Sequence, residues 1–344
     1  MSFSLSYSGI NTKVRAMDSK LISLEDYKKI STLETVVDFI AFLKNHPGYK
    51  DIFQKYDERE LHRGEAERMF IYGFYTDFTK IYRFANGFQR KDLALLFFRY
   101  EVNVLKSLLR SMYNSESTND LSLFLPFFKK HSQINVEVLA TSRTMEEYIQ
   151  NLKGTEYYPL FVKIQSGANA TSFDYEMQLD IYYFKKAWKL KESQLTSVSR
   201  KAFTHRFGTE IDLLNIIWIY RSKKMYDLNA GDILAYLIPI NYKLSKDQLM
   251  KLAGTASIEE FSSVLSSTYY KAIYQHLADG TIETDYKHII QKIFQVHTTK
   301  YPASMTTVNY YLYRKELEIS QLTTALECIR YGLDPKDKLK YILQ

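Results

Sequence analysis

The most apolar part of the chain lies at residues 210–224, and its pattern is that of a helix with no polar face. Every position from Leu213 to Tyr220 is apolar except Asn215, and no Gly or Pro interrupts the run. A helix that is apolar on all sides is stable when other helices surround it. We therefore predict a buried central helix here, in which the Asn215 amide needs a hydrogen-bond partner.

The same pattern occurs three times along the chain. The segment from Asp212 to Arg221 matches residues 101–110, and a third copy occupies residues 318–327. The first acids of the three copies are 111 and 106 residues apart. We therefore predict three homologous helical repeats, with boundaries at 1–116, 117–228 and 229–344. The polar repeat positions that we expect to be structural are Glu101, Arg110, Asp212, Asn215, Arg221, Glu318 and Gln321.

A predicted helix start also recurs in each repeat. Thr35, Thr144 and Ser257 each precede an acid by three residues, and they are 109 and 113 residues apart. A hydroxyl at such a position accepts a hydrogen bond from an unpaired backbone amide, and the acid faces the positive end of the helix dipole. Apolar residues at helical spacing follow each of them. Tyrosines come next in all three repeats, at Tyr49, Tyr157-Tyr158 and Tyr269-Tyr270.

A further helical stretch of acidic and aromatic residues completes each repeat. These stretches are Glu65 to Phe84, Glu176 to Trp188 and Glu283 to Phe294. Each repeat is therefore predicted to be mainly a three-helix bundle, and the chain to be all-α. A shorter helix is expected at residues 13–22, and the polar segment 114–120 is the strongest candidate for a linker.

The acids of the repeats have structural explanations. Asp38, Glu147 and Glu260 follow the predicted caps. The acids at 101, 212 and 318 are expected to start the buried helices, where a negative charge favours the dipole. The amides Asn215 and Gln321 are expected to set the register of those helices through buried hydrogen bonds.

Composition supports a helical protein and leaves the partner open. The 344 residues include 29 Tyr and 21 Phe but only 12 Gly and 6 Pro, which favours long helices. The net charge of +7 leans towards an acidic partner, but the excess is mild, and a mixed, solvated surface is the explanation that we favour. Cys328, the single cysteine, excludes an internal disulfide. No signal peptide and no apolar run of ~18 residues is present, so we expect a soluble or peripheral protein.

Motifs for catalysis or cofactor binding are absent from the sequence. It contains no Gly-rich phosphate loop, and none of its seven histidines is paired at the i,i+3 or i,i+4 spacing of helical metal ligands. The run at 182–191 interleaves lysines and aromatics in a way that suits nucleic acid. On a helix, however, Ile181, Phe184 and Trp188 share an apolar face, and Lys185, Lys186 and Lys189 lie outside it. We therefore favour an amphipathic core helix for this run. We therefore expect no catalytic, cofactor or metal site and no small-molecule substrate.

Several phrases in this order resemble the C subunit of the archaeal and bacterial V/A-type rotary ATPases, which is related to the eukaryotic vacuolar ATPase d subunit. Residues 13–21 are similar to the family's opening phrase. The spacing of Asp212, Asn215 and Arg221 resembles its inner-helix motif, of which residues 101–110 are a looser copy. The C-terminal phrases are Pro302, Tyr310-Tyr311, Lys315-Glu316, Glu318-Ile319 and Gln321-Leu322, followed by Gly332-Leu333 and Pro335.

The resemblance implies a funnel of three helical bundles around a pseudo-threefold axis. In such a complex the protein is peripheral, on the cytoplasmic face of the membrane. It seats the central stalk, made of D- and F-type subunits, on the proteolipid ring and transmits torque for H⁺ or Na⁺ transport. By the same resemblance we expect that it is not an enzyme and has no active site of its own. The alternatives are a helical scaffold unrelated to rotary ATPases and a nucleic-acid-binding protein, for which the resemblance gives no support.

Overall fold

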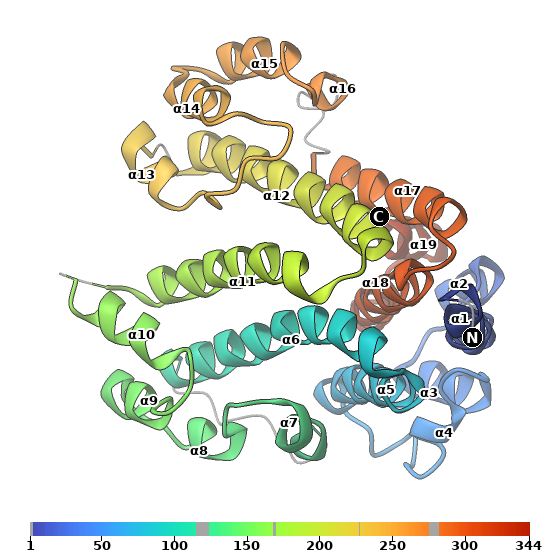
Figure 1. Cartoon of the computed structure of the whole chain (residues 1–344). Coiled ribbons are helices and arrows are strands. Elements are labelled where there is room, and N and C mark those ends of the chain that lie inside the picture. Colours follow the sequence, from blue (N-terminus) through green and yellow to red (C-terminus); the bar gives the residue numbers. More distant parts are fainter. Residues whose placement is uncertain (1–2, 115–123, 168–169, 227, 275–281) are drawn as a thin grey trace. The chain divides into compact units, whose positions relative to one another are not determined.

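The chain folds into helices joined by short connections (Figure 1). The computed structural model describes residues 3–114, 124–167, 170–226, 228–274 and 282–344. These ranges contain no β-strand, so the prediction of an all-α fold is confirmed. The helices group into two compact units, which consist of residues 1–86 with 297–344, and of residues 87–296.

Unit 1 is assembled from both ends of the chain. Its helices are α1 (Phe3–Asp18), α2 (Leu24–Ser31), α3 (Val36–Asn45), α4 (Lys50–Phe53), α5 (Arg63–Phe84), α18 (Thr306–Arg330) and α19 (Pro335–Leu343). Helix α18 is the centre of this unit, because α1, α3 and α5 all pack against it. Helix α19 packs on α18 and on α2.

Unit 2 is continuous in sequence. Its helices are α6 (Gly87–Tyr113), α7 (Leu125–His131), α8 (Val136–Ala140), α9 (Met145–Asn151), α10 (Tyr158–Gln165), α11 (Ser172–Gln194), α12 (Ser197–Met225), α13 (Ala230–Ala235), α14 (Lys246–Gly254), α15 (Ile258–Ser266) and α16 (Lys271–Tyr274). Helix α11 lies between α6 and α12 and packs against both (Figure 1). The boundary between the units falls within α17 (Ile282–Lys300).

The three predicted helix starts are confirmed. Thr35, Thr144 and Ser257 are the N-caps of α3, α9 and α15, and each side chain accepts a hydrogen bond from the backbone N–H of the acid three residues later. Two of the acids also accept a hydrogen bond from the residue before the cap, Glu147 from Arg143 and Glu260 from Ala256. The acidic-aromatic stretches are also helical, as α5, α11 and α17.

The first helix is longer than predicted. It begins at Phe3 instead of Lys13 and ends at Asp18 instead of Ile22. Tyr7, Ile10 and Val14 are buried, at spacings of three and four residues, and this apolar face stabilises the earlier turns. The expected linker at 114–120 lies, except for Asn114, outside the described residues, as does the predicted boundary at 116/117.

The central helix is buried as the sequence predicted. In α12, Ile211, Leu213, Ile216 and Ile219 are all at most 1% exposed. Helix α12 also makes a close approach at Gly208, where a Cβ would lie only 2.5 Å from the ring of Tyr242. None of the described helices is long and apolar enough to cross a bilayer.

Candidate functional site

Three buried carboxylates, one in each of the long helices α6, α12 and α18, are the strongest candidate site in the chain. Each of them accepts hydrogen bonds from a later or earlier loop and from a tyrosine hydroxyl. The prediction that the acids start their helices is wrong. The helices begin at Gly87, Ser197 and Thr306, so each acid lies well inside its helix, where loop donors rather than the helix dipole stabilise its charge.

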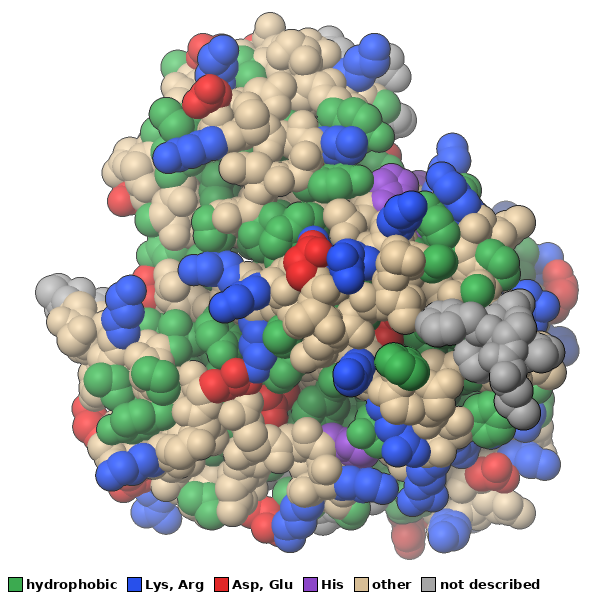
Figure 2. Space-filling view, in the orientation of Figure 1, with side chains coloured by type: hydrophobic (Ala, Val, Ile, Leu, Met, Phe, Trp, Pro, Cys, Tyr) green, Lys and Arg blue, Asp and Glu red, His purple; other side chains and the backbone are tan. Residues whose placement is uncertain are grey.

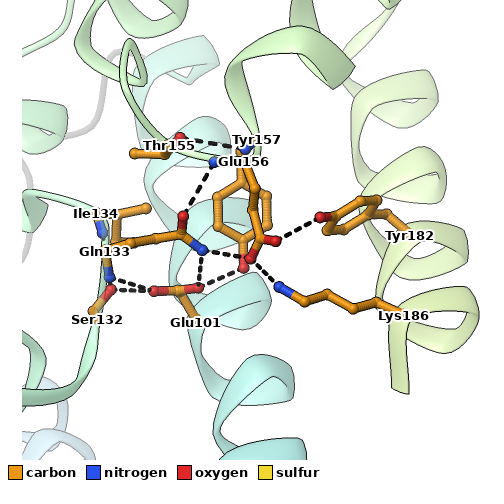
Figure 3. A network of polar contacts seen from close by, with 9 residues as sticks. All are labelled: Glu101, Ser132, Gln133, Ile134, Thr155, Glu156, Tyr157, Tyr182 and Lys186. Carbon is orange, nitrogen blue, oxygen red and sulfur yellow. Dashed lines mark hydrogen bonds and ion pairs between the residues drawn. The ribbon is translucent and has the colours of Figure 1, made fainter. Parts of the chain in front are cut away.

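The Glu101 site belongs to unit 2 (Figure 3). The Glu101 side chain is 1% exposed. Its Oε1 accepts hydrogen bonds from the Ser132 hydroxyl and from the backbone N–H of Gln133, at 3.0 Å for the latter. Its Oε2 accepts one from the Tyr157 hydroxyl at 2.5 Å. The connection after α7 and the turn before α10 are therefore both attached to the middle of α6.

A second carboxylate, Glu156, extends this network towards α11. Glu156 accepts hydrogen bonds from the Tyr182 hydroxyl at 2.8 Å, from Lys186 Nζ and from the Gln133 side chain. Burial opposes its charge, yet these hydrogen bonds lower the pKa of Glu156. The Lys186 ammonium also lies 3.7 Å from the centre of the Phe98 ring. Helices α6 and α11 and the turn between α9 and α10 therefore share one polar network.

The Asp212 site also belongs to unit 2 and has the same plan. Asp212 Oδ2 accepts hydrogen bonds from the backbone N–H groups of Lys243 and Leu244, at 2.7 and 3.2 Å, and from the Tyr270 hydroxyl at 2.9 Å. Its Oδ1 is buried and has no hydrogen-bond partner in the described part of the chain. Burial raises the pKa of Asp212, although the hydrogen bonds oppose that shift.

The Glu318 site belongs to unit 1 and joins the two ends of the chain. Its Oε2 accepts a hydrogen bond from the backbone N–H of Ile22 at 2.5 Å, and its Oε1 accepts one from the Tyr49 hydroxyl at 2.6 Å. Oε1 also lies 2.6 Å from the ammonium of Lys315, one turn earlier on α18. Of the three sites, this is the one that contains a buried ion pair.

The tyrosines of all three sites are held in the neutral form. Burial, and then the charge of the neighbouring carboxylate, raises the pKa of Tyr49, Tyr157 and Tyr270 far above its ordinary value. A neutral tyrosine hydroxyl donates its hydrogen to the carboxylate, which is the arrangement seen in each site. The tyrosine is therefore the donor and the carboxylate the acceptor in each site. Because these contacts hold segments of the fold together, we call each carboxylate with its donors a fastening.

The other predicted repeat positions lie near these sites but make different contacts. The Asn215 side chain donates a hydrogen bond to the Ile238 carbonyl at 3.0 Å and accepts one from the Ile238 N–H at 2.9 Å. Gln321 accepts one from the Tyr27 hydroxyl at 2.8 Å. Both amides therefore hold a segment from outside their own helix.

The two predicted arginines are at the surface. Arg110 forms an ion pair with Glu176, which connects α6 to α11. Its side chain is 58% exposed, so this pair contributes little to stability. Arg221 is exposed on α12 and borders a cavity of about 410 Å³ that Asn215 and Trp218 also line.

The tyrosines are conspicuous in the sequence, but the pattern did not connect them to the acids. Tyr157 follows Glu101 by 56 residues and Tyr270 follows Asp212 by 58. This near-equal spacing was the one signal in the sequence for the pairing of acid and tyrosine. The third tyrosine precedes its acid, since Tyr49 lies 269 residues before Glu318. Lys315 belongs to one of the family phrases, but nothing in the repeated pattern marked it as the partner of Glu318, because the other two sites have Phe98 and Thr209 at the corresponding position.

The environment of the candidate groups limits the chemistry that they can perform. The described residues contain no group of three or more His, Cys, Asp or Glu side chains that could hold a metal ion. Cys328 is buried, and burial raises the pKa of its thiol, which opposes formation of the nucleophilic thiolate. Five of the six carboxylate oxygens of the three sites accept hydrogen bonds from groups of the described chain, the exception being Oδ1 of Asp212.

Comparison with known proteins identifies the family. The sequence model of the ATP synthase (C/AC39) subunit family matches residues 10–341. The chain is similar to the A-type ATP synthase C subunit of Methanosarcina mazei, with 26% identity over 78% of this chain and 71% of that protein. It is also similar to the proteins of the same name from Thermococcus kodakarensis and Methanosarcina barkeri. Both are 24% identical over 96% of this chain, and the matches cover 88% and 92% of the relatives. The chain therefore belongs to the ATP synthase C/AC39 family, that of the C subunits of the V/A-type ATPases.

Proposed function

We propose that this member of a rotary ATPase is its coupling element, which seats the central stalk on the membrane proteolipid ring. It transmits torque between ATP turnover and the transport of H⁺ or Na⁺ and has no active site of its own. Its partners are the D- and F-type stalk subunits and the ring, and it is peripheral to the cytoplasmic face of the membrane. Family membership supports this proposal, because the relatives are named as subunits of A-type ATP synthases.

The proposed architecture is a funnel of three homologous three-helix bundles around a pseudo-threefold axis. The three carboxylate sites support the threefold repetition, since each occupies the same position in the repeated motif. Each acid is bonded to residues on the far side of a predicted boundary: Glu101 contacts Tyr157, and Glu318 contacts Tyr49. Repeats that exchange contacts in this way are held more tightly than separate bundles joined by linkers.

The observation that carries the proposal is this recurring internal fastening. A body that transmits torque must resist deformation, and short helices resting on a long helix would otherwise slide. Hydrogen bonds to a charged acceptor are worth about 1.5–3 kcal/mol each, which makes such contacts costly to break. The carboxylates of α6 and α12 each accept three of them from other segments of the chain, and that of α18 accepts two, from Ile22 and Tyr49, beside its ion pair with Lys315.

The test of coupling is a comparison of ATP hydrolysis with ion transport. Inverted membrane vesicles from cells lacking the gene are compared with vesicles from cells carrying it on a plasmid. We expect ATP-driven ion uptake to be lost without the protein and restored by the plasmid, while the separated catalytic head still hydrolyses ATP. Unchanged uptake in vesicles without the protein would refute the proposal.

The partners are tested by affinity purification of the tagged protein from gently solubilised native membranes. We expect the proteolipid and the central-stalk subunits to be recovered with it, and not with the tag alone. Recovery of the protein by itself, from membranes that contain the ATPase, would instead favour the helical scaffold.

A further inference from the structure

An open groove runs along α11 on the side that faces α10, within unit 2. Its volume is about 880 Å³. Helix α11 lines it with a stripe of side chains at helical spacing, and α10 forms the opposite wall. The lining residues that bear on its binding properties are Leu160, Lys163, Ile164, Ile181, Lys185, Lys189 and Leu190.

Three of the four lysines that line this groove are not used by the fold. Lys163, Lys185 and Lys189 are exposed, and none of them has an ion-pair or hydrogen-bond partner among the residues that the structure describes. Lys186, in contrast, is bound to Glu156. Figure 2 shows Lys and Arg side chains over the region of α11. Like charges held close together raise the local potential and attract an anionic partner.

Asp174, the one acid among the described residues that line the groove, does not neutralise these lysines. The Asp174 carboxylate accepts hydrogen bonds from the Tyr236 hydroxyl at 2.6 Å and from the backbone N–H and hydroxyl of Thr171, both at 2.7 Å. It belongs to the N-terminal cap of α11. The lysines lie in the C-terminal half of that helix and on α10, so the excess positive charge remains available to a partner.

The groove also has an apolar floor. Leu160, Ile164 and Leu190 are half-buried, while Ile181 is buried. Ile181, Phe184 and Ala187 are held inside the protein, whereas Lys185 and Lys189 point away from that core. A strip of apolar side chains bordered by cations is complementary to a helix with an apolar face and acidic flanks.

The length of the groove fits such a helix. The lining of α11 extends from Asp174 to Leu190, which is about 24 Å at 1.5 Å per residue. A partner helix of about 16 residues spans this distance. A flat membrane surface contacts protruding side chains, whereas here the apolar contacts lie at the bottom of a groove between two helices.

We propose that the groove between α10 and α11 is a docking site for an acidic amphipathic helix of a partner protein, held by Lys163, Lys185 and Lys189. The site does not depend on the three carboxylate fastenings or on the coupling role. It assigns a function to the lysine-aromatic run that the family motifs leave without one.

The experiment measures the binding of fluorescent helical peptides of about 16 residues to the full-length protein by anisotropy. Three peptides share one leucine-rich face and differ only in their flanks, which carry Glu, Gln or Lys. We expect the Glu peptide to bind more tightly than the Gln peptide and the Lys peptide to bind least, with the preference reduced at high salt. Equal binding of the Glu and Gln peptides would overturn the proposal.

The position of the site is tested with two matched triple variants. Replacing Lys163, Lys185 and Lys189 by Gln should weaken the binding of the Glu peptide about tenfold, because three exposed ion pairs are lost together. The control replaces the exposed Lys153, Lys246 and Lys251 of the same unit by Gln, which changes the net charge equally, and should leave binding unchanged. An equal loss in both variants would show a general charge effect and sink the site.

A third variant tests the apolar floor, and vesicles test the alternative partner. Leu160→Ser should weaken the binding of the Glu peptide and leave the salt dependence of that binding unchanged. A purely ionic patch would not lose affinity when an apolar residue is replaced. Vesicles of anionic phospholipid are compared with neutral ones. If anionic vesicles bind the protein in a way that requires the three groove lysines and the peptides do not bind, the surface is a lipid contact and the helix proposal fails.

Discussion

Lys315 and Glu318 form a buried ion pair on α18, with 2.6 Å between Nζ and Oε1 and side chains that are 2% and 4% exposed. The ammonium also lies 4.0 Å from the centre of the Tyr49 ring, and the Tyr49 hydroxyl donates to the same carboxylate oxygen. The positive charge therefore has two neighbours, and the negative charge has three donors. Neither charge can lose its partner without being left in a medium that solvates it poorly.

Replacing Lys315 alone should lower the free energy of unfolding far more, relative to the number of groups changed, than replacing both members of the pair. Lys315→Met leaves the Glu318 charge buried with one donor fewer, and we expect a loss of about 3–5 kcal/mol in the free energy of unfolding. The double variant with Glu318→Gln should lose much less than the sum of the two single variants. Denaturant unfolding of the four proteins measures the coupling, and additive losses would contradict the pairing.

The hydroxyl of Tyr49 should be worth about as much as one hydrogen bond to a charged group. Tyr49→Phe keeps the buried ring and removes one of the donors to Glu318, so we expect a loss of about 1.5–3 kcal/mol. Tyr331→Phe is the control, because that ring is 68% exposed and its hydroxyl is not part of a buried site. Equal unfolding midpoints for the two variants would mean that the fastening contributes nothing.

Asp212 should make the folding stability depend on pH in a direction opposite to that of most carboxylates. Its folded-state pKa is raised above the ordinary 3.8, so the folded protein holds this proton more tightly than the unfolded chain does. Unfolding then releases a proton, and stability falls as pH rises from about 4 through the raised pKa. Asp212→Asn removes this term. The unfolding free energy of the wild type minus that of the variant should therefore fall as pH rises through that window. A difference that instead rises with pH would contradict the raised pKa of Asp212.

Asn215 should contribute more than its counterpart on α18. Asn215→Ala removes both hydrogen bonds to Ile238 and leaves that residue's buried backbone groups without these partners, for a loss of about 1–3 kcal/mol. Gln321→Ala removes one bond at a half-buried position and should cost less. Thermal unfolding of the two variants tests the order, which fails if Gln321→Ala proves the more damaging.

The close approach at Gly208 predicts an inverted response to a helix-favouring substitution. Gly→Ala inside a helix normally stabilises by up to ~1 kcal/mol. At Gly208, however, the new methyl would clash with the Tyr242 ring, so we expect a net loss of about 1–3 kcal/mol. Gly64→Ala on α5, where a Cβ meets no atom within 4 Å, is the control and should be neutral or stabilising. Stabilisation by both substitutions would show that Tyr242 yields without cost.

The sequence predicted local features better than distant ones, for a physical reason. The caps at Thr35, Thr144 and Ser257 depend on residues three positions away, so a short pattern is enough to find them. The burial of α12 follows from its own composition. The predicted start of α1 was wrong, because its polar residues hid a narrow apolar face.

Contacts between distant segments could not be predicted in this way. Two of the three donors to Glu318 come from Ile22 and Tyr49, which are 296 and 269 residues away in sequence, and periodicity contains no information about which helix neighbours which. The acids were recognised as a repeated set. Their predicted position at the start of a helix was wrong, since the pattern shows where conspicuous residues begin and not where the backbone first becomes helical.

The joining of both chain ends in unit 1 has a consequence for synthesis. The helices α1 to α4 leave the ribosome before the segment 87–296, yet their partner α18 is translated only after it. Until then the Tyr49 hydroxyl and the Ile22 amide have no carboxylate, and the apolar faces of α1 and α3 have no central helix. The continuous segment 87–296 carries both of its fastenings within itself. The nascent chain therefore acquires the contacts of its middle before those of its beginning, and the N-terminal segment must be kept from aggregating while it waits.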